Sequence, residues 1–329
     1  MLIRRVTATP SSSTSASADS EVDTESFQFQ RDLLELKRLS ASLGCSMNDW
    51  RDVRLSFRSA TINFDKGWRQ DTKPPLRQRG RVLVFGGSSV LCLETRDSDT
   101  VVSSLQELLL DHGVLHQCLN RGVSGATVKR NWSDIRQEAI RETDVVVVLF
   151  GLNDAKVTQY AQIGRGVLAH VPLYVQALGY FRIRLRSLIA HYLWTVSVKL
   201  DVTRQEDLCR SCAIDVTSIL DQIDKHVVRR GARFVAVLEP HLWMKQSEWS
   251  ESEKRASGRY ATTTPLLLEY QYEAFRQQLL SRGWFYSAEH ACNTPRSAFI
   301  DWSHRTALGN KILATRLHSI LESSQSIGQ

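Results

Sequence analysis

The chain has 329 residues, of which 42% are hydrophobic and 23% are charged. At roughly 150 residues per domain, this length suits one large α/β domain or two small ones, and the hydrophobic fraction excludes a chain disordered throughout. The 42 lysines and arginines outnumber the 35 acidic residues by 7. Acidic residues are interleaved with the basic ones, so we expect no nucleic-acid partner; binding through the Arg-rich residues 69–81 is a minor alternative.

The sequence shows neither a secretory signal nor a membrane span. Its N-terminus lacks an apolar stretch, and the apolar run at 145–150 is far shorter than the about 20 residues of a membrane helix. We therefore expect a soluble, cytoplasmic protein. The six cysteines are too sparse for a disulfide scaffold, and Cys209 and Cys212 form a lone pair without further ligands at metal-binding spacing. We expect no metal site.

The first quarter of the chain divides into a tail and a lead-in segment. Residues 1–26 are rich in serine and threonine and poor in large aliphatic side chains, so we expect a disordered tail. Residues 27–80 form the lead-in. Leucines at helical spacing predict a short helix that ends near Gly44, and an irregular, Arg-rich approach to the main fold follows over 51–80.

From residue 81 to about residue 322, short apolar runs alternate with segments of helical periodicity. The predicted strands cover residues 82–85, 114–119, 145–150, 233–238 and 284–287. The predicted helices cover residues 99–112, 132–143, 213–230, 265–281 and 305–322. This alternation predicts a three-layer α/β/α domain over 81–322, with a mainly parallel sheet of about five strands. Residues 323–329 form a C-terminal tail.

A segment without a predicted strand, at about residues 155–200, interrupts the alternation. Apolar side chains recur at helical spacing between Val175 and Tyr192, with three arginines among them. We favour a core-facing helix with a solvated basic face. A lid or a membrane-surface helix over a site is the alternative.

Residues suited to acyl transfer follow four of the apolar runs. In open α/β sheets the ligand lies beyond the carboxyl ends of the strands, so we expect these segments to meet. They are Gly86-Gly87-Ser88-Ser89, Asn120 to Gly125, Gly151-Leu152-Asn153-Asp154 and, after the run at 298–300, Asp301-Trp302-Ser303-His304. Together they supply a hydroxyl, flexible turns, a side-chain amide and a carboxylate–imidazole pair.

Each of these groups has a defined part in acyl transfer. A serine hydroxyl becomes a nucleophile when an imidazole takes its proton, and a carboxylate holds that imidazole in one tautomer. Ser88, His304 and Asp301 are the candidates for these three parts. An oxyanion needs preorganised N–H donors, and the backbone N–H groups of Ser88 and Gly125 and the amide of Asn153 are the candidate donors.

In this order the four segments resemble the sequence blocks of the SGNH, or GDSL-type, hydrolases, a family of serine esterases and acyl hydrolases. The matching residues are Gly86-Gly87-Ser88, Asn120 with Gly125, the GxND of Gly151 to Asp154, and the DxxH of Asp301 and His304. The resemblance covers about residues 81–322 and implies a flavodoxin-like sheet with Ser88 as the nucleophile. One departure is Gly87, where the family name implies an aspartate outside the triad.

We therefore expect a serine-dependent ester hydrolase that works through an acyl-enzyme, without a metal ion or organic cofactor. The resemblance implies an O-acyl ester as substrate, such as an O-acetyl carbohydrate or a lipid ester, so the partner is a small molecule, a glycan or a lipid. The alternatives are an O-acyltransferase with the same triad and a catalytically silent, hydrolase-like binding module. A nucleotide site is not expected, since neither a GxGxxG nor a phosphate loop follows the first strand.

Other polar residues near the predicted site have simpler interpretations. We expect Ser89 to be a helix cap or a packing residue, and Asp154 to cap the loop after its strand. Glu239-Pro240-His241 ends the strand at 233–238, where a turn is the favoured interpretation and substrate contact the alternative.

Overall fold

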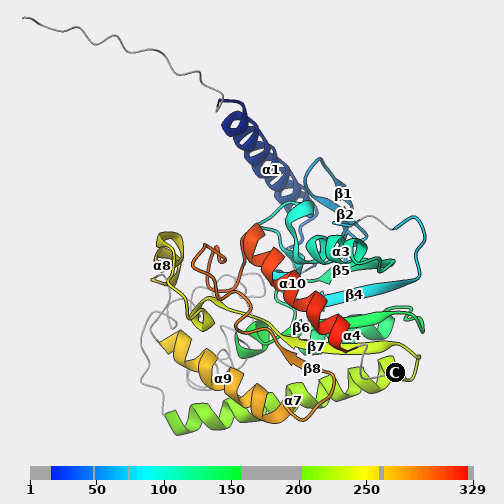
Figure 1. Cartoon of the computed structure of the whole chain (residues 1–329), viewed down its shortest axis with the longest axis vertical. Coiled ribbons are helices and arrows are strands. Elements are labelled where there is room, and N and C mark those ends of the chain that lie inside the picture. The colour runs from blue at the N-terminus through cyan, green and yellow to red at the C-terminus, as the bar shows by residue number, and fades with distance from the viewer. Residues whose placement is uncertain (1–15, 47–48, 73–74, 157–201, 259–262, 325–329) are drawn as a thin grey trace, which may run out of the picture.

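The computed structural model describes residues 16–46, 49–72, 75–156, 202–258 and 263–324. Within them, the main domain is a five-stranded parallel sheet between two layers of helices (Figure 1), which confirms the predicted fold class. The insertion expected at about 155–200 lies, from residue 157 on, outside the described residues. No helix in the described part of the chain is long and apolar enough to span a membrane.

The order of the strands determines where a site forms. The strands are β4 (Gly80–Gly86), β5 (His116–Gly122), β6 (Val145–Phe150), β7 (Arg233–Leu238) and β8 (Phe285–Ser287). They are all parallel and lie in the order β5-β4-β6-β7-β8. The chain therefore runs from β4 to one edge and then returns across β4 to β6. In sheets of this flavodoxin-like order, ligands bind where the order reverses, beyond the carboxyl ends of these two strands.

Helices cover both faces of the sheet because the central strands bury side chains on both sides. The helices of the main domain are α2 (Ser88–Leu91), α3 (Val101–Asp111), α4 (Val128–Gln137), α7 (Val202–Val228), α8 (Glu251–Ser257), α9 (Thr263–Leu279) and α10 (Ala307–Ser323). Val82 and Val84 pack with α3 and α10, whereas Leu83 and Phe85 pack with α4, α7 and α9. Successive side chains of a strand point to opposite faces, so a continuous apolar run such as β4 needs a helical layer on each side.

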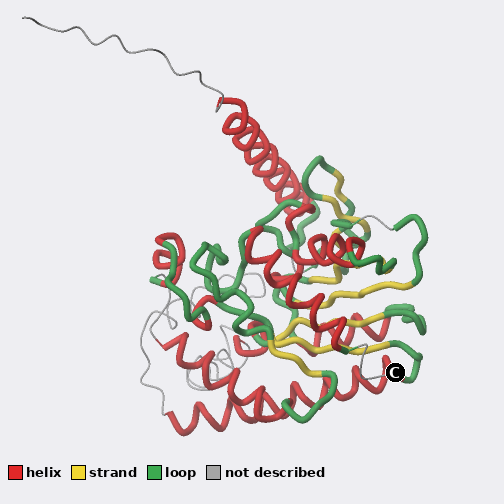
Figure 2. Tube along the Cα trace, viewed as in Figure 1, coloured by secondary structure: helices red, strands yellow, loops and turns green. Residues whose placement is uncertain are grey.

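The lead-in segment contains more regular structure than the sequence predicts. The helix α1 (Ala16–Ser42) projects from the body in Figure 1 and begins at Ala16, within the stretch expected to be a tail. Three strands, β1 (Phe57–Arg58), β2 (Asn63–Asp65) and β3 (Trp68–Arg69), form a small antiparallel sheet (Figure 2) where irregular structure is expected. Strands of two or three residues are too short to show a period in the sequence. A separate apolar cluster that includes Leu36, Trp50 and Phe64 holds them to α1.

Two further differences concern the segments that carry candidate residues. The helix α4 begins at Val128 instead of residue 132, because the buried carboxylate of Asp154 accepts the Val128 N–H at 3.0 Å and fixes the start of the helix. The run at 298–300 does not join the main sheet. Instead, Phe299 forms an isolated antiparallel bridge with Arg305. Asp301 therefore lies in the loop before α10 and not at the end of a strand of the sheet.

Candidate active site

Ser88 is the first residue of α2 and lies directly beyond the carboxyl end of β4. The other three residues of this short helix, Ser89, Val90 and Leu91, are buried, whereas Ser88 is partly exposed. Packing of α2 therefore fixes the backbone of Ser88 and leaves its hydroxyl accessible. This position is the point in the sheet where the order of the strands reverses.

Asp301 and His304 lie in a tight loop that the carboxylate itself organises. The backbone N–H of Ile300 donates to the His304 carbonyl at 2.8 Å and closes the loop. Asp301 Oδ1 accepts the backbone N–H groups of Ser303 and His304 at 2.7 and 2.8 Å. Asp301 Oδ2 lies 2.7 Å from His304 Nδ1. One carboxylate thus fixes both the backbone of the loop and the orientation of the imidazole.

The imidazole of His304 connects this loop to Ser88, 216 positions away in the sequence, with 2.8 Å between Nε2 and Ser88 Oγ. Because Nδ1 faces a carboxylate, the neutral ring carries its proton on Nδ1 and presents Nε2 as the acceptor for the hydroxyl. The side chains of Asp301 and His304 are 31% and 20% exposed. Water therefore has access to this chain of hydrogen bonds.

Charge and burial shift the pKa values of both groups. Burial disfavours the Asp301 carboxylate, but the hydrogen bonds and charge of His304 outweigh it and hold the pKa of Asp301 below its ordinary value. Burial also disfavours the His304 imidazolium, yet the Asp301 hydrogen bond and the negative charge of Glu94 raise the pKa of His304 overall. Glu94 Oε1 lies 3.6 Å from His304 Nε2. The sequence does not predict this role for Glu94, since a glutamate in this loop belongs to no recognisable motif.

The amide of Asn153 lies beside Gly87, the residue that precedes Ser88. A Cβ atom at Gly87 would lie 2.1 Å from Asn153 Nδ2, so only glycine leaves room for the amide. Asn153 Nδ2 donates one hydrogen bond to the Ala126 carbonyl at 2.9 Å. A primary amide has two N–H donors, and the described residues supply no acceptor for the second. The glycine at the position where the family name implies aspartate thus has a steric reason.

Gly125 lies in the turn that follows β5. The Ala126 N–H donates to the Val123 carbonyl at 3.0 Å, and Gly125 has a φ of +70°, as the third residue of a type II turn requires. The Val123 N–H donates to the Gly86 carbonyl at 3.0 Å, which ties this turn to the end of β4. The turn and the Asn153 amide therefore meet around Gly87, next to Ser88.

Asn120, Glu239 and His241 are three further polar residues that the sequence places near the site. Asn120 lies within β5 instead of after it, and its amide donates to the Val90 carbonyl at 2.9 Å, which braces α2. Glu239 and His241 are each only 1% exposed, so they lie in the core and not on a rim open to substrate. Burial, with His290 nearby, lowers the pKa of His241 to about 3.

No protein-family model and no curated protein matches this sequence. Among solved structures, the chain is similar to an acetyl xylan esterase at 12% identity and a TM-score of 0.44, over 73% of this chain and 98% of that one. A member of the lipolytic protein G-D-S-L family from Veillonella parvula has 11% identity and a TM-score of 0.42, over 72% of this chain and 95% of its own. The psychrotrophic esterase EstA from Pseudoalteromonas has 10% identity and a TM-score of 0.42, with coverages of 75% and 98%.

Proposed function

We propose that this protein is a serine-dependent ester hydrolase of the SGNH, or GDSL, type. The observation that carries the proposal is the chain of hydrogen bonds from Asp301 through His304 to Ser88, with lengths of 2.7 and 2.8 Å. These three residues come from two segments far apart in the sequence, and each has the residue type that its part in acyl transfer needs. The motif order along the sequence supports the same function independently.

The geometry supports a defined first half-reaction. Ser88 Oγ attacks the carbonyl carbon of the ester as its proton moves to His304 Nε2, and the carbonyl electron pair moves to the oxygen. The N–H groups of Ser88 and Gly125 and the second amide N–H of Asn153 stabilise that oxyanion. The Nε2 proton then passes to the leaving alcohol oxygen as its bond to carbon breaks. Asp301 keeps the imidazole oriented throughout.

In the second half-reaction, water attacks the acyl-enzyme, with His304 again taking and returning the proton. The partial exposure of His304 and Asp301 favours water as the acceptor over transfer to a second alcohol, which needs water excluded. The substrate class that the motif resemblance implies is an O-acyl ester, such as an O-acetyl carbohydrate or a lipid ester. Each part in the two half-reactions belongs to a side chain or a backbone N–H group of this chain.

The test is hydrolysis of p-nitrophenyl esters from acetyl to decanoyl by the wild type, Ser88→Ala and Ser89→Ala. We expect Ser88→Ala to lower kcat by roughly 10⁴-fold or more, because the other triad members have no nucleophile to act on. Ser89→Ala is the matched control: it removes the neighbouring, buried hydroxyl and should retain most of the activity. Turnover that survives Ser88→Ala, or a wild type inactive on every ester, contradicts the proposal.

A further inference from the structure

We propose that Glu94 is a charge-stabilising residue of this site: held in place by Arg69 of the lead-in segment, its carboxylate stabilises the imidazolium that His304 becomes during catalysis. The inference rests on the proposed ester hydrolysis and deepens it. Asp301 faces Nδ1 of the imidazole, whereas Glu94 faces Nε2, the nitrogen that receives the Ser88 proton.

The position of Glu94 follows from the backbone that ends α2. The Cys92 N–H donates to the Ser88 carbonyl at 2.8 Å, and Cys92 itself has a φ of +53°, which ends the helix. The Thr95 N–H then donates to the Cys92 carbonyl at 3.1 Å, which makes Glu94 the third residue of a four-residue turn. Ser88 and Glu94 therefore belong to one short, hydrogen-bonded unit, and both side chains meet His304 Nε2.

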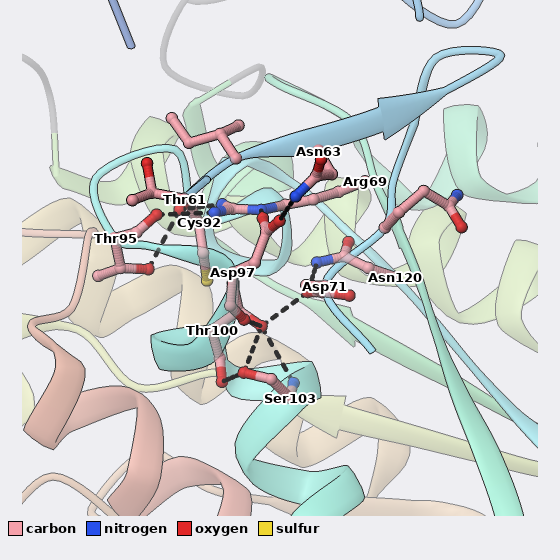
Figure 3. A network of polar contacts seen from close by, with 12 residues as sticks. Thr61, Asn63, Arg69, Asp71, Cys92, Thr95, Asp97, Thr100, Ser103 and Asn120 are labelled. Atoms are coloured by element: carbon pink, nitrogen blue, oxygen red, sulfur yellow. Dashed lines mark hydrogen bonds and ion pairs between the residues drawn. The ribbon is translucent and has the colours of Figure 1, made fainter. Parts of the chain in front are cut away.

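Arg69 of β3 holds both ends of this turn (Figure 3). Its guanidinium donates to the carbonyls of Leu91 and Thr95 at 2.7 Å each, and it also donates to the Cys92 carbonyl. The side chain of Arg69 has no exposed surface. Five N–H donors in a rigid plane suit several carbonyls at fixed positions, which a flexible lysine ammonium cannot match.

The buried charge of Arg69 is itself paired. Arg69 Nε lies 2.8 Å from Asp97 Oδ1, and Asn63 Nδ2 donates to the other oxygen of Asp97 at 2.8 Å (Figure 3). The Asp97 N–H donates to the Thr61 carbonyl at 2.8 Å, so the ion pair is anchored in the lead-in segment. Breaking this pair would leave an uncompensated buried charge, which is costly. The guanidinium and the carboxylate therefore stay together in a fixed position. The lead-in segment thereby sets the position of Glu94.

The charges around His304 leave Glu94 as the acid that acts on Nε2. Asp301 faces Nδ1 of the ring. Glu239 is buried, and its Oε2 lies 3.7 Å from Arg305 Nη1. Lys156 contributes the opposing positive charge and lies over the Trp302 ring at 4.3 Å. The carboxylate of Glu94 favours the protonated ring, so it lowers the energy of the state in which Ser88 has given up its proton.

The Glu94 charge should move the pH profile of the reaction to higher pH. His304 must be neutral to accept the Ser88 proton, so kcat/KM rises with pH through the pKa of His304. Removing the Glu94 charge makes the imidazolium less stable and lowers that pKa. In Glu94→Gln the acidic limb of the profile therefore moves to lower pH, and the plateau rate falls because the base is weaker. Glu94 is 33% exposed, so added salt should weaken the effect in the wild type.

The test is a titration of the His304 ring protons by NMR, with the kcat/KM profile measured on the same proteins. The variants are Glu94→Gln, Glu94→Asp and the control Glu107→Gln, which removes the same charge from an exposed position on α3. We expect the titration midpoint of His304 to lie at lower pH in Glu94→Gln than in the wild type, and between the two in Glu94→Asp. In the control Glu107→Gln the midpoint should stay at the wild-type value. An inactive wild type overturns the proposed function and, with it, the catalytic role of Glu94. An active wild type with an unchanged midpoint in Glu94→Gln overturns the role of Glu94 alone.

Arg69→Lys tests the holding role. Lysine keeps the positive charge but cannot reach three carbonyls and Asp97 together, so the turn should relax and Glu94 should retreat from His304. We expect the His304 midpoint to fall in Arg69→Lys and to fall no further when Arg69→Lys is added to Glu94→Gln. Shifts that add in the double variant would show that Arg69 acts on His304 by another route.

Discussion

Gly87 illustrates how one absent side chain makes room for a neighbouring amide at the site. The Asn153 amide occupies the space where a Cβ atom at this position would lie. From there it donates a hydrogen bond to the Ala126 carbonyl. The backbone at Gly87 has a φ of −84°, which any residue adopts, so the requirement for glycine is steric and not conformational. A side chain at position 87 therefore competes directly with the amide.

We expect Gly87→Ala to lower kcat about 100-fold and to change KM less. The new methyl group must displace Asn153, and the loss of one oxyanion donor costs about 3 kcal/mol of the activation barrier. The measurement is steady-state hydrolysis by Gly87→Ala, Asn153→Ala and the double variant. If the methyl group acts through the amide, the double variant is no slower than Asn153→Ala. A fully active Gly87→Ala would show that the amide is not needed.

The residues whose chemistry is restricted could be predicted from the sequence, and those placed by tertiary contacts could not. Ser88, Asn153, Asp301 and His304 stand in sequence motifs, and each has a part in the proposed acyl transfer that very few residue types can take. Glu94 carries no such signal, since its effect depends on a turn that Arg69 holds from another part of the chain. The sequence therefore predicts that Ser88, His304 and Asp301 come together, which the structure shows, but not that Glu94 joins them.

At the scale of elements, the loop before α10 connects the packing of a helix to the position of His304. Thr306 is the N-cap of α10: its hydroxyl accepts the Gly309 N–H at 3.2 Å and donates to the Ser297 carbonyl at 2.9 Å. The Thr306 N–H also donates to the Ala298 carbonyl at 3.0 Å. These hydrogen bonds join residues 297 and 298 to the start of α10. His304 lies in the loop between them, so the same bonds fix the start of the helix and the position of the imidazole.

Thr306→Ala should lower the free energy of unfolding by about 1 kcal/mol, the usual cost of losing an N-cap hydroxyl. Thr306→Ser retains the hydroxyl and should recover most of that loss, which makes it the control. Urea unfolding of the three proteins, followed by circular dichroism, provides the measurement. Equal stability of the alanine and serine variants would show that the hydroxyl bonds contribute nothing to the loop.

The central strands β4, β6 and β7 are predicted well because they are buried on both sides. Each of them contains a continuous apolar run, and a run of that kind has few alternatives in an α/β chain. The sequence does not predict β1 to β3, because they are short and depend on the cluster around Trp50 and Phe64. The shifted start of α4 has the same origin, since Asp154 reaches it from the end of β6.

At the scale of the whole molecule, buried polar groups join the lead-in segment to the main domain. Asp71, in the lead-in, accepts the Asn120 amide at 2.7 Å and the Thr100 hydroxyl at 2.6 Å (Figure 3). Burial raises the pKa of Asp71 to about 6, although Arg69 and the two hydrogen bonds oppose the rise. The folded protein thus holds this proton to a higher pH than the unfolded chain does.

The consequence is that the contribution of Asp71 to stability falls as the pH rises from about 4 to about 6, since the Asp71 carboxyl then binds fewer protons in the unfolded state than in the folded one. Asp71→Asn removes this contribution. Relative to the wild type, the variant should gain on the order of 3 kcal/mol between pH 4 and pH 7.5, from a shift of about two pKa units. Urea unfolding at both pH values measures this gain. Asp65→Asn, at an exposed position of β2 in the same lead-in segment, controls for the lost charge. A difference between Asp71→Asn and wild type that is the same at both pH values contradicts the prediction.

The lead-in segment also covers one edge of the main sheet. β5 is the outermost strand of the main sheet on its side, where β3 packs against it and the Thr72 hydroxyl bonds the Cys118 carbonyl at 2.6 Å. A bare outer strand offers backbone groups to which another chain can add. Removing the lead-in would therefore expose backbone groups of β5 to pairing with another chain. Within residues 49–72, β3 and Thr72 thus cover the outer edge of the main sheet.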